Sequence, residues 1–351
     1  MEFKKIDILS SPREEWILYH KFRKLYHLEN TPDEPYMEDN KWEESDMADY
    51  KNSLIDMEFN NYRILDSHEI IGTFNFRFYK ETSSGFEGNG QIVKFEIEIL
   101  KKYHRQGLGT QALSIMYHEC SKFNKTIFIS ERQNFLTKPF FIAVGANIVQ
   151  TLIKNRLDLD RIDFDILNKW VTEGELRNRE TRIIIQEGKI PEEIALEFAK
   201  SFNDSVQHIP RDGIAMVRTE FGIVELRRME KINDSGKVKS IYVIAIEKSG
   251  EISGITNVRI IPSNDELLYQ AITGVPMSFR GRKLGKLIKA KMVLYIKEKY
   301  PNAKYIITDN AETNDSMLNI NRKLGYKKFK ELLSFQVDKQ HLQSYLQSKN
   351  M

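Results

Sequence analysis

The sequence contains an internal repeat, which restricts the chain to folds that combine two copies of one structural unit. Short patterns recur in the same order in both halves of the chain. One pattern, Gly72, Asn75 and Arg77, recurs at one common spacing as Gly254, Asn257 and Arg259. A second, Gly109, recurs at a slightly shorter spacing as Gly285. A third, Asn134 and Gly145, recurs at an intermediate spacing as Asn314 and Gly325. Because several unlike patterns share nearly one spacing, we expect a duplicated fold.

The chain length agrees with two domains. Its 351 residues exceed the size at which one hydrophobic core usually suffices, so two cores are expected. The best linker candidate is the polar stretch 168–180, which has few apolar residues besides Trp170 and Val171. The predicted domains are therefore 1–165 and 174–351, joined by a linker at 166–173.

Hydrophobic periodicity predicts the same succession of elements in both halves. Each half begins with a strand and a helix, continues with strands, and then has a strand, a Gly-containing loop, a helix, a further strand and a short helix. In the first half the predicted helix is 14–26 and the predicted strands are 3–9, 62–65, 69–79 and 91–100. In the second half the predicted helix is 191–202 and the predicted strands are 181–186, 223–230, 238–248, 251–261 and 267–275. This order predicts an α/β fold with a mixed sheet (α+β) in each half. The insertion Glu29–Tyr50 is either a lid over a cleft or a solvated surface segment.

The composition excludes several classes of protein. With 41% hydrophobic and 29% charged residues, the chain resembles ordinary globular proteins and not disordered ones. Its net charge of +3 is too balanced for a nucleic-acid-binding or membrane-binding surface. The single cysteine, Cys120, excludes an intrachain disulfide and a multi-cysteine zinc site, and we expect it to be buried. No metal site is expected, and the absence of a signal peptide or long apolar run predicts a cytoplasmic protein.

Two basic loops that contain glycine carry the functional signal. Residues 101–110 and 280–286 each lie between a strand and a helix. Backbone N–H groups at such a helix start are unsatisfied, and together with the helix dipole they bind phosphate, while glycine lets the backbone approach closely. The second loop region adds further positive charges that are expected to meet phosphates, namely Arg280, Arg282, Lys283, Lys286 and Lys289.

Other phosphate-binding motifs do not fit these loops. The chain has no G-x-G-x-x-G after its first strand and no G-x-x-x-x-G-K-S/T anywhere. A basic helix start without a ligand would explain one loop alone. Two loops in matching context favour two anion-binding sites.

At these loops the sequence resembles the GNAT superfamily of N-acetyltransferases, whose pyrophosphate-binding loop follows the pattern Q/R-x-x-G-x-G/A. The first loop, His104 to Gly109, keeps both glycines but has histidine at the Gln/Arg position. The second, Arg280 to Gly285, keeps the leading arginine and last glycine but has Lys283 in place of the first glycine. This second form is similar to tandem, two-domain GNAT proteins of the mycothiol synthase type.

The resemblance implies acetyl-CoA as the cofactor. Its pyrophosphate is expected on His104, Arg105, Gln106, Gly107, Leu108, Gly109 and Thr110 in the first half, and on Arg280, Gly281, Arg282, Lys283, Leu284, Gly285 and Lys286 in the second. Asn134 and Asn314 would contact the pantetheine arm, and backbone groups near Ile99 and Val275 would hold the thioester carbonyl. Both asparagines also fit the role of helix N-caps.

Candidates for the catalytic base lie on strands beside the loops. Glu96 and Glu98 share one face of the strand before the first loop, and Asp309 lies on a late strand of the second half. A solvated sheet face is the alternative for the glutamates, and a turn or cap role for Asp309. The tyrosine that many GNAT enzymes use to protonate the leaving thiolate is replaced by Phe141 and Asn321. We favour the second half for activity because of its tandem-family signature.

The sequence thus predicts an acetyl-CoA-dependent N-acetyltransferase that acts on a primary amine of a small-molecule or peptide-like acceptor. The alternative is a non-catalytic or half-degenerate acyl-CoA-binding module. The expected partners are the acceptor amine and the cofactor, and neither nucleic acid nor a membrane is expected. The protein is expected to be a monomer or a homodimer.

Overall fold

The structure, a computed structural model, describes residues 1–34, 36–235, 238–261 and 264–351. It divides into two compact units, each assembled from separate segments of the chain. Unit 1 contains residues 1–151, 213–219 and 332–351, and unit 2 contains residues 152–212 and 220–331.

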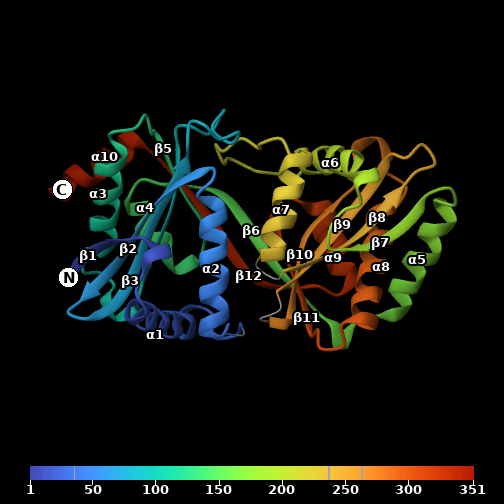
Figure 1. Ribbon diagram of the computed structural model, residues 1–351, viewed down its shortest axis with the longest axis horizontal. Helices are drawn as coiled ribbons and strands as arrows, with labels where there is room; N and C mark the ends of the chain where they lie inside the picture. The colour runs from blue at the N-terminus through green and yellow to red at the C-terminus, as the bar shows by residue number, and fades with distance from the viewer. Residues whose placement is uncertain (35, 236–237, 262–263) are drawn as a thin grey trace. The chain divides into compact units, whose positions relative to one another are not determined.

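Unit 1 is a mixed sheet with helices on both faces (Figure 1). Its strands lie in the order β1-β2-β3-β4-β5-β12, and β4–β5 is the parallel pair. The strands are β1 (Glu2–Ile6), β2 (Met57–Asp66), β3 (Glu69–Tyr79), β4 (Ile92–Ile99), β5 (Ile127–Gln133) and β12 (Lys327–Asp338), and the helices are α1 (Arg13–Asn30), α2 (Asp39–Ser53), α3 (Leu108–Cys120), α4 (Lys138–Ala143) and α10 (Lys339–Ser348).

Unit 2 repeats this arrangement. Its strands lie in the order β6-β11-β10-β9-β8-β7, and β10–β11 is the parallel pair. The strands are β6 (Asn147–Asp158), β7 (Arg182–Glu187), β8 (Lys239–Ile246), β9 (Ile252–Ile261), β10 (Asn264–Gly274) and β11 (Tyr305–Ala311), and the helices are α5 (Phe164–Arg177), α6 (Glu192–Gln207), α7 (Ile223–Ser235), α8 (Leu284–Lys299) and α9 (Asp315–Leu324).

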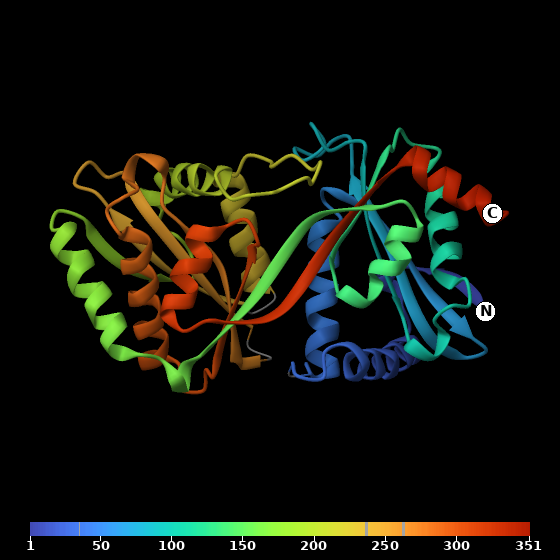
Figure 2. The same ribbon diagram turned by 180° about the vertical axis from the view of Figure 1, so that it is seen from behind.

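The two units exchange their last strand and helix. β6 and α5 follow the first repeat along the chain, yet β6 pairs with β11 and α5 packs against α8 in unit 2. β12 and α10 follow the second repeat, yet β12 pairs with β5 in unit 1, where the α10 residue Tyr345 places its hydroxyl 2.8 Å from the Thr110 hydroxyl of α3. Figure 2 shows β6 in green and β12 with α10 in red. Each unit is therefore completed by the other half of the sequence.

The stretch predicted as a linker, 166–173, is instead part of helix α5. Its polar residues misled the prediction because they lie on the exposed side, while Leu167, Trp170 and Gly174 face the interior at helical spacing. The domain ranges 1–165 and 174–351 stay a prediction about the two repeated halves of the sequence. The compact units of the structure are each discontinuous in sequence.

The core of unit 2 lies on both faces of its sheet. Alternate residues of β8 point to opposite faces. Ile241, Val243 and Ala245 join the core that contains α5 and α8, and Tyr242 and Ile244 join the core that contains α6 and α7. Because both faces of β8 are covered, its residues 241–246 are apolar without interruption.

Cys120 is buried in unit 1, as predicted, and this burial raises the pKa of its thiol to about 12. A cysteine of this kind is a packing residue and not a nucleophile. Among the described helices, none is long and apolar enough to cross a membrane.

The strand predicted over 223–230 is wrong, because these residues begin helix α7. The β-branched start suggested a strand, but the buried residues Leu226, Glu230 and Asn233 follow helical spacing. The Glu225 carboxylate also accepts a hydrogen bond from the Gly222 N–H at 3.0 Å, which stabilises the helix start. Most of the insertion 29–50 is helical as well, since it contains the end of α1 and much of α2.

Candidate active site

Both basic loops adopt the same backbone conformation. The first has positive φ angles at Arg105 (62°) and Gly107 (80°), and the second has them at Gly281 (86°) and Lys283 (62°). At the spacing that relates Gly109 to Gly285, Gly281 corresponds to Arg105 and Lys283 to Gly107. Each loop therefore places glycine at one left-handed position and a long basic residue at the other, which costs roughly 1 kcal/mol for the non-glycine residue.

The first residue of each loop anchors the loop to the preceding strand. His104 Nε2 lies 2.9 Å from the carbonyl oxygen of Ile99, and Arg280 Nε donates a 3.2 Å hydrogen bond to the carbonyl of Val275. Histidine in the first loop thus makes the contact that arginine makes in the second. The predicted role of backbone groups near Ile99 and Val275 in holding a thioester carbonyl stays a prediction.

The first loop presents an open helix start. Residues 104–107 are exposed, and a side chain at Gly107 would meet nothing within 4 Å. The first intrahelical bond of α3 is donated by Gln111 to Gly107 at 2.9 Å, so the preceding N–H groups of Leu108, Gly109 and Thr110 are the unsatisfied groups of this helix start. A backbone of this form binds anions.

Gly109 has a different role, because a Cβ there would lie 2.9 Å from the Phe140 ring of α4. The glycine lets the start of α3 pack closely against α4 in unit 1. The second loop has more space at this position, since a Cβ at Gly285 would come no closer than 3.8 Å to Ile320 and Val275.

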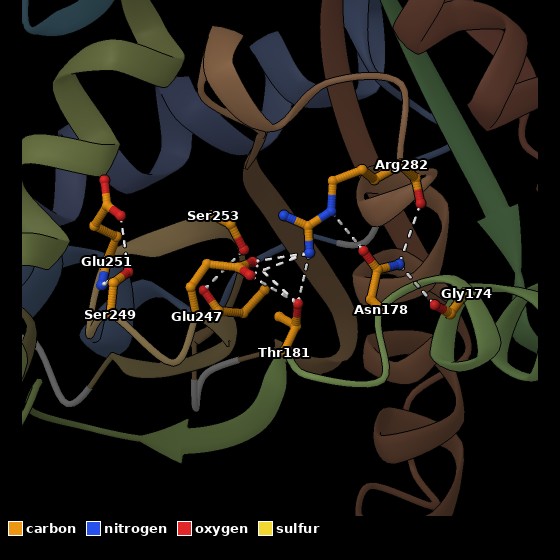
Figure 3. Close-up of polar contacts among 9 residues, drawn as sticks. Gly174, Asn178, Thr181, Glu247, Ser249, Glu251, Ser253 and Arg282 are labelled. Carbon is orange, nitrogen blue, oxygen red and sulfur yellow. Dashed lines mark hydrogen bonds and ion pairs between the residues drawn. The ribbon is translucent and has the colours of Figure 1, made fainter.

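The Arg282 side chain of the second loop is turned into unit 2 (Figure 3). Its Nε donates to Asn178 Oδ1 at 2.8 Å, its Nη2 donates to Thr181 Oγ1 at 2.7 Å, and an ion pair joins it to Glu247 at 3.1 Å. Burial acts to raise the pKa of Glu247, but hydrogen bonds from Ser253, Arg282 and Thr181 hold it below its ordinary value. Arg282 therefore fastens the loop to the protein.

Two lysines of the second loop region are also committed to protein contacts. Lys283 Nζ pairs with Glu173 Oε2 at 2.8 Å. The side chain of Lys289 on α8 is buried inside unit 2, with 1% of its surface exposed, so the expectation that it meets phosphate is wrong. In the first loop, by contrast, Arg105 is exposed and forms no ion pair with any carboxylate of the described residues.

Lys286, half-buried in α8, has its Nζ 5.1 Å from the ring centroid of Trp170. Burial, and then the charges of Lys323 and Lys283, hold the pKa of Lys286 below its ordinary value. The exposed Arg280 and this local excess of positive charge are the anion-attracting features that the second loop retains.

The parallel strands separate beside each loop. β4 and β5 pair over residues 92–94 and 127–129, and β10 and β11 pair over residues 267–269 and 305–307. Beyond these short ladders, the loop-side ends of β4 and β10 have a sheet partner on one side only. Their free backbone groups suit an extended ligand that runs between the strands.

Asn134 and Asn314 are helix caps in the structure. The Asn134 side chain accepts a hydrogen bond from the Leu136 N–H at 2.9 Å, and that of Asn314 accepts one from the Met317 N–H at 3.3 Å. The capping role is confirmed, and contact with a pantetheine arm stays a prediction.

Glu98 is the carboxyl group in unit 1 that is best placed for proton transfer. It lies near the end of β4, next to the separating strands and the loop, and its Oε2 accepts a 3.1 Å hydrogen bond from Thr73. Burial, and then the neighbouring Glu96 carboxylate, raise the pKa of Glu98 to about 7. Glu96 is held differently, because its Oε1 pairs with Arg77 at 3.2 Å. A carboxyl group with a pKa near neutrality is suited to general base catalysis.

Unit 2 lacks this carboxyl group. The residue that corresponds to Glu98 is Gly274, where a Cβ would lie 2.3 Å from Ser205 Cβ of α6. Its cross-strand partner is the core residue Ile255, where unit 1 has Thr73. The sheet face under α6 is thus closely packed and largely apolar. Asp309 lies on β11 opposite Lys154 of β6, away from this position.

Neither unit has a tyrosine at the thiolate position. Phe141 is buried and stacks on Phe335 with ring centroids 4.4 Å apart. Asn321 is buried and joins a polar network: its Oδ1 accepts from Lys289 Nζ at 2.7 Å, and its Nδ2 donates to Asn310 at 2.7 Å. Nothing in the sequence indicated this network, because Lys289 was indistinguishable from its exposed neighbours.

The structure adds residues of α1, α2 and β2 that the sequence analysis missed. They form one cluster, in which guanidinium groups lie over aromatic rings: Tyr19 and Arg23 of α1, Trp42 of α2 and Arg63 of β2. The i, i+4 spacing of Tyr19 and Arg23 on one helix face was the available signal.

Comparisons with known proteins agree with the fold. No family model and no curated protein matches the sequence. Among solved structures, a tandem GNAT protein from the clavulanic acid biosynthesis pathway has a TM-score of 0.71 at 16% identity, covering 96% of this chain and 98% of its own. A GCN5-related N-acetyltransferase from Sphaerobacter thermophilus has a TM-score of 0.61 at 11% identity, with 96% and 95% covered. A GNAT-family acetyltransferase from Colwellia psychrerythraea has a TM-score of 0.53 at 8% identity, with 95% and 98% covered.

At these identities the likeness concerns the fold. The chain has the architecture of a tandem GNAT protein over nearly its whole length, so the predicted resemblance and fold class are confirmed.

Proposed function

We propose that this protein is an N-acetyltransferase that uses acetyl-CoA to acetylate a primary amine of a small-molecule or peptide-like acceptor, and that unit 1 is the active unit. The observation that carries the proposal is Glu98, a carboxyl group with a pKa of about 7 that lies where β4 separates from β5, beside an open anion-binding loop. This assignment differs from the sequence-based preference for the second half.

The residues of unit 1 fit the requirements of amine acetylation. Bound acetyl-CoA would supply an acetyl group activated as a thioester. The exposed loop 104–107 and the first N–H groups of α3 would hold its pyrophosphate. An amine attacks only as the free base, so the Glu98 carboxylate would take a proton from the acceptor ammonium, directly or through water. Thr73 holds the Glu98 carboxyl group in place.

A half-degenerate module is the second candidate, and unit 2 is the observation that favours it. Gly274 replaces the base, and Arg282 and Lys283 of the second loop are paired with carboxylates. In this version the protein binds acyl-CoA without transferring the acyl group, and tight coenzyme binding without transfer to any amine of a broad panel would favour it.

The loop assignment is tested by a matched pair of substitutions, Gly107→Ala and Gly281→Ala. The two glycines have φ angles of 80° and 86° and open surroundings, so alanine should cause similar backbone strain at both positions. The two variants therefore differ mainly in which unit they change. We expect Gly107→Ala to weaken acetyl-CoA binding about 10-fold or more in calorimetry, and Gly281→Ala to leave it nearly unchanged. Absence of any acetyl-CoA binding by the unmodified protein at millimolar ligand would refute the proposal.

The base is tested by the pH dependence of acetyl transfer. Because Glu98 acts as a carboxylate, kcat/KM should rise with pH through about 7, and Glu98→Gln should lower it by about 10²- to 10⁴-fold and remove that rise. Glu96→Gln is the control. It removes the negative neighbour that raises the Glu98 pKa, so the rise should move to lower pH with little loss of rate. Undiminished transfer by Glu98→Gln would show that another group is the base.

A further inference from the structure

Unit 1 holds two buried guanidinium groups on the same side of the sheet as Glu98. Arg23 of α1 is 9% exposed and Arg63 of β2 is 6% exposed. The Arg63 guanidinium carbon lies 3.8 Å from the ring centroid of Tyr19, and that of Arg23 lies 5.9 Å from the same ring. We refer to Arg23, Arg63, Tyr19 and Trp42 as the guanidinium cluster.

Aromatic rings hold these guanidinium groups and leave their edges available. The Arg23 guanidinium carbon lies only 3.4 Å from the ring centroid of Trp42. The N–H donors of a guanidinium group lie in its plane, so a ring stacked on its face does not use them. Stacking therefore orients the groups but does not satisfy their hydrogen bonds.

Some donors of the cluster have no acceptor. Arg23 Nη1 and Arg63 Nε are buried and lack a hydrogen-bond partner within the part of the chain that the structure describes. Over the same residues, no carboxylate forms an ion pair with either guanidinium group. Burial of a cationic donor without an acceptor is unfavourable, so an acceptor supplied by a ligand would be favoured.

The nearby carboxylates leave one positive charge over. Asp46 of α2 accepts a 2.7 Å hydrogen bond from Trp42, and its charge acts on Arg23 and Tyr19. Other acids of α2 are matched by exposed cations, Asp39 by Lys24 and Glu43 by Arg13. Once Glu98 has taken a proton from the acceptor ammonium, two guanidinium groups face one carboxylate, that of Asp46. A carboxylate on the acceptor then restores the balance, whereas a phosphate dianion would leave an excess of negative charge.

Glu98 lies within electrostatic range of the cluster. The charge of Arg23 acts on the Glu98 carboxyl group, and the charges of Arg63 and Glu98 both act on the Tyr19 hydroxyl, whose pKa is raised mainly by burial. Arg63 lies opposite Thr73, and Thr73 lies opposite Glu98, so Arg63 and Glu98 are two strand spacings, about 10 Å, apart on one face of the sheet.

We propose that the guanidinium cluster binds a carboxylate of the acceptor, so that the acetylated amine belongs to an amino acid or a similar compound with an amine and a carboxylate a few atoms apart. Two planar cationic donors match the two oxygens of a carboxylate. The inference rests on the proposed function, because it names the acceptor class of the same site.

The test compares amines that differ only in the carboxylate. Acetyl transfer is measured by thiol release for a series of amino acids, their amides and the corresponding decarboxylated amines. We expect kcat/KM to be about 10- to 100-fold higher for the carboxylate-bearing member of each set. Equal rates for all three members would overturn the inference while leaving the proposed function standing.

Variants connect this preference to the cluster. Arg63→Lys keeps the charge but loses the planar donors, and Arg23→Gln removes one charge; each should reduce the preference for the carboxylate about 10-fold or more. Lys21→Gln is the control, because it removes an exposed charge of α1 that pairs with Glu69. A preference unchanged in both arginine variants would contradict the assignment.

A binding measurement separates the two proposals. Since Arg23 stacks on Trp42, amino acids should change the Trp42 fluorescence saturably, and decarboxylated amines should not. Trp42→Phe identifies that signal. If no amine is acetylated but this change occurs and is weakened in Arg63→Lys, the proposed function fails and the carboxylate site stands. If neither transfer nor fluorescence change occurs, both proposals are overturned.

Discussion

Lys289 shows how burial changes the role of a residue at constant chemistry. It lies on α8 beyond a basic loop, but its ammonium group donates to Gln270 at 2.6 Å and Asn321 at 2.7 Å in the interior of unit 2. The hydroxyl of Tyr326 also donates to Gln270 at 2.9 Å. Burial lowers the pKa of Lys289 to about 7. Protonation of this lysine is therefore coupled to the stability of unit 2.

The coupling predicts a pH-dependent difference between the protein and Lys289→Met. Between pH 7 and 10.5 the unfolded chain retains a proton on Lys289 that the folded protein has released, so this residue makes the free energy of unfolding rise with pH. The increment is at most about 1.4 kcal/mol per pH unit. The stability of the protein minus that of Lys289→Met should therefore increase by about 2–3 kcal/mol from pH 7.5 to 9.5 in urea unfolding.

Lys291→Met is the control for this measurement. Lys291 lies on the same helix, but its Nζ pairs with Glu175 at 2.6 Å near the surface. A difference between the protein and Lys289→Met that stays flat from pH 7.5 to 9.5 would show that Lys289 keeps an ordinary pKa.

At the scale of elements, the exchanged helix α5 packs closely against α8 at Gly174. A Cβ at Gly174 would lie 2.7 Å from Leu287 Cβ, so the two helices pack without a side chain between them. Gly174→Ala should force them apart, at a cost of about 1–3 kcal/mol for overpacking. A Cβ at Gly285 on α8 would lie 3.8 Å from its nearest neighbours, an ordinary van der Waals contact, so Gly285→Ala should be neutral or stabilising, since alanine favours helix.

The measurement for this pair is the melting temperature. Relative to Gly285→Ala, Gly174→Ala should melt several degrees lower, because each kcal/mol shifts the midpoint by about 2–4 °C for a unit of this size. Equal melting temperatures would mean that α5 moves away from α8 without cost.

The elements that local sequence determines were predictable, and those that depend on packing were not. The two loops were recognised because a glycine-containing helix start is a local pattern, and strand alternation made Glu98, together with Glu96, a candidate for the base. Its raised pKa was not, because the burial comes from the packing of the unit around it. The strand predicted over 223–230 failed because β-branched residues outweighed a helical pattern of buried positions.

At the scale of the whole molecule, the exchange of strands could not be read from the sequence. β6 and β12 follow corresponding helices in the two repeats, and both strands are 12 residues long. The choice between β5 and β11 as partner is a long-range decision that local propensity does not encode. The repeat therefore predicted two units but not which segments each unit contains.

A truncation tests the exchange directly. A chain that ends at Glu331 loses the part of β12 that pairs with β5, together with α10 and its buried residues Leu342 and Leu346. If β12 and α10 complete unit 1, their removal should make amide hydrogen exchange faster in α3 and β5. The amides of α8 in unit 2 should stay protected. Without the exchange, the same truncation would remove the last strand and helix of the second repeat's own sheet, so α8 would lose protection and α3 would keep it. A chain shortened only to residue 349 is the control, and both regions should remain protected in it. The opposite pattern in the Glu331 truncation, with α8 exposed and α3 protected, would exclude the exchanged arrangement.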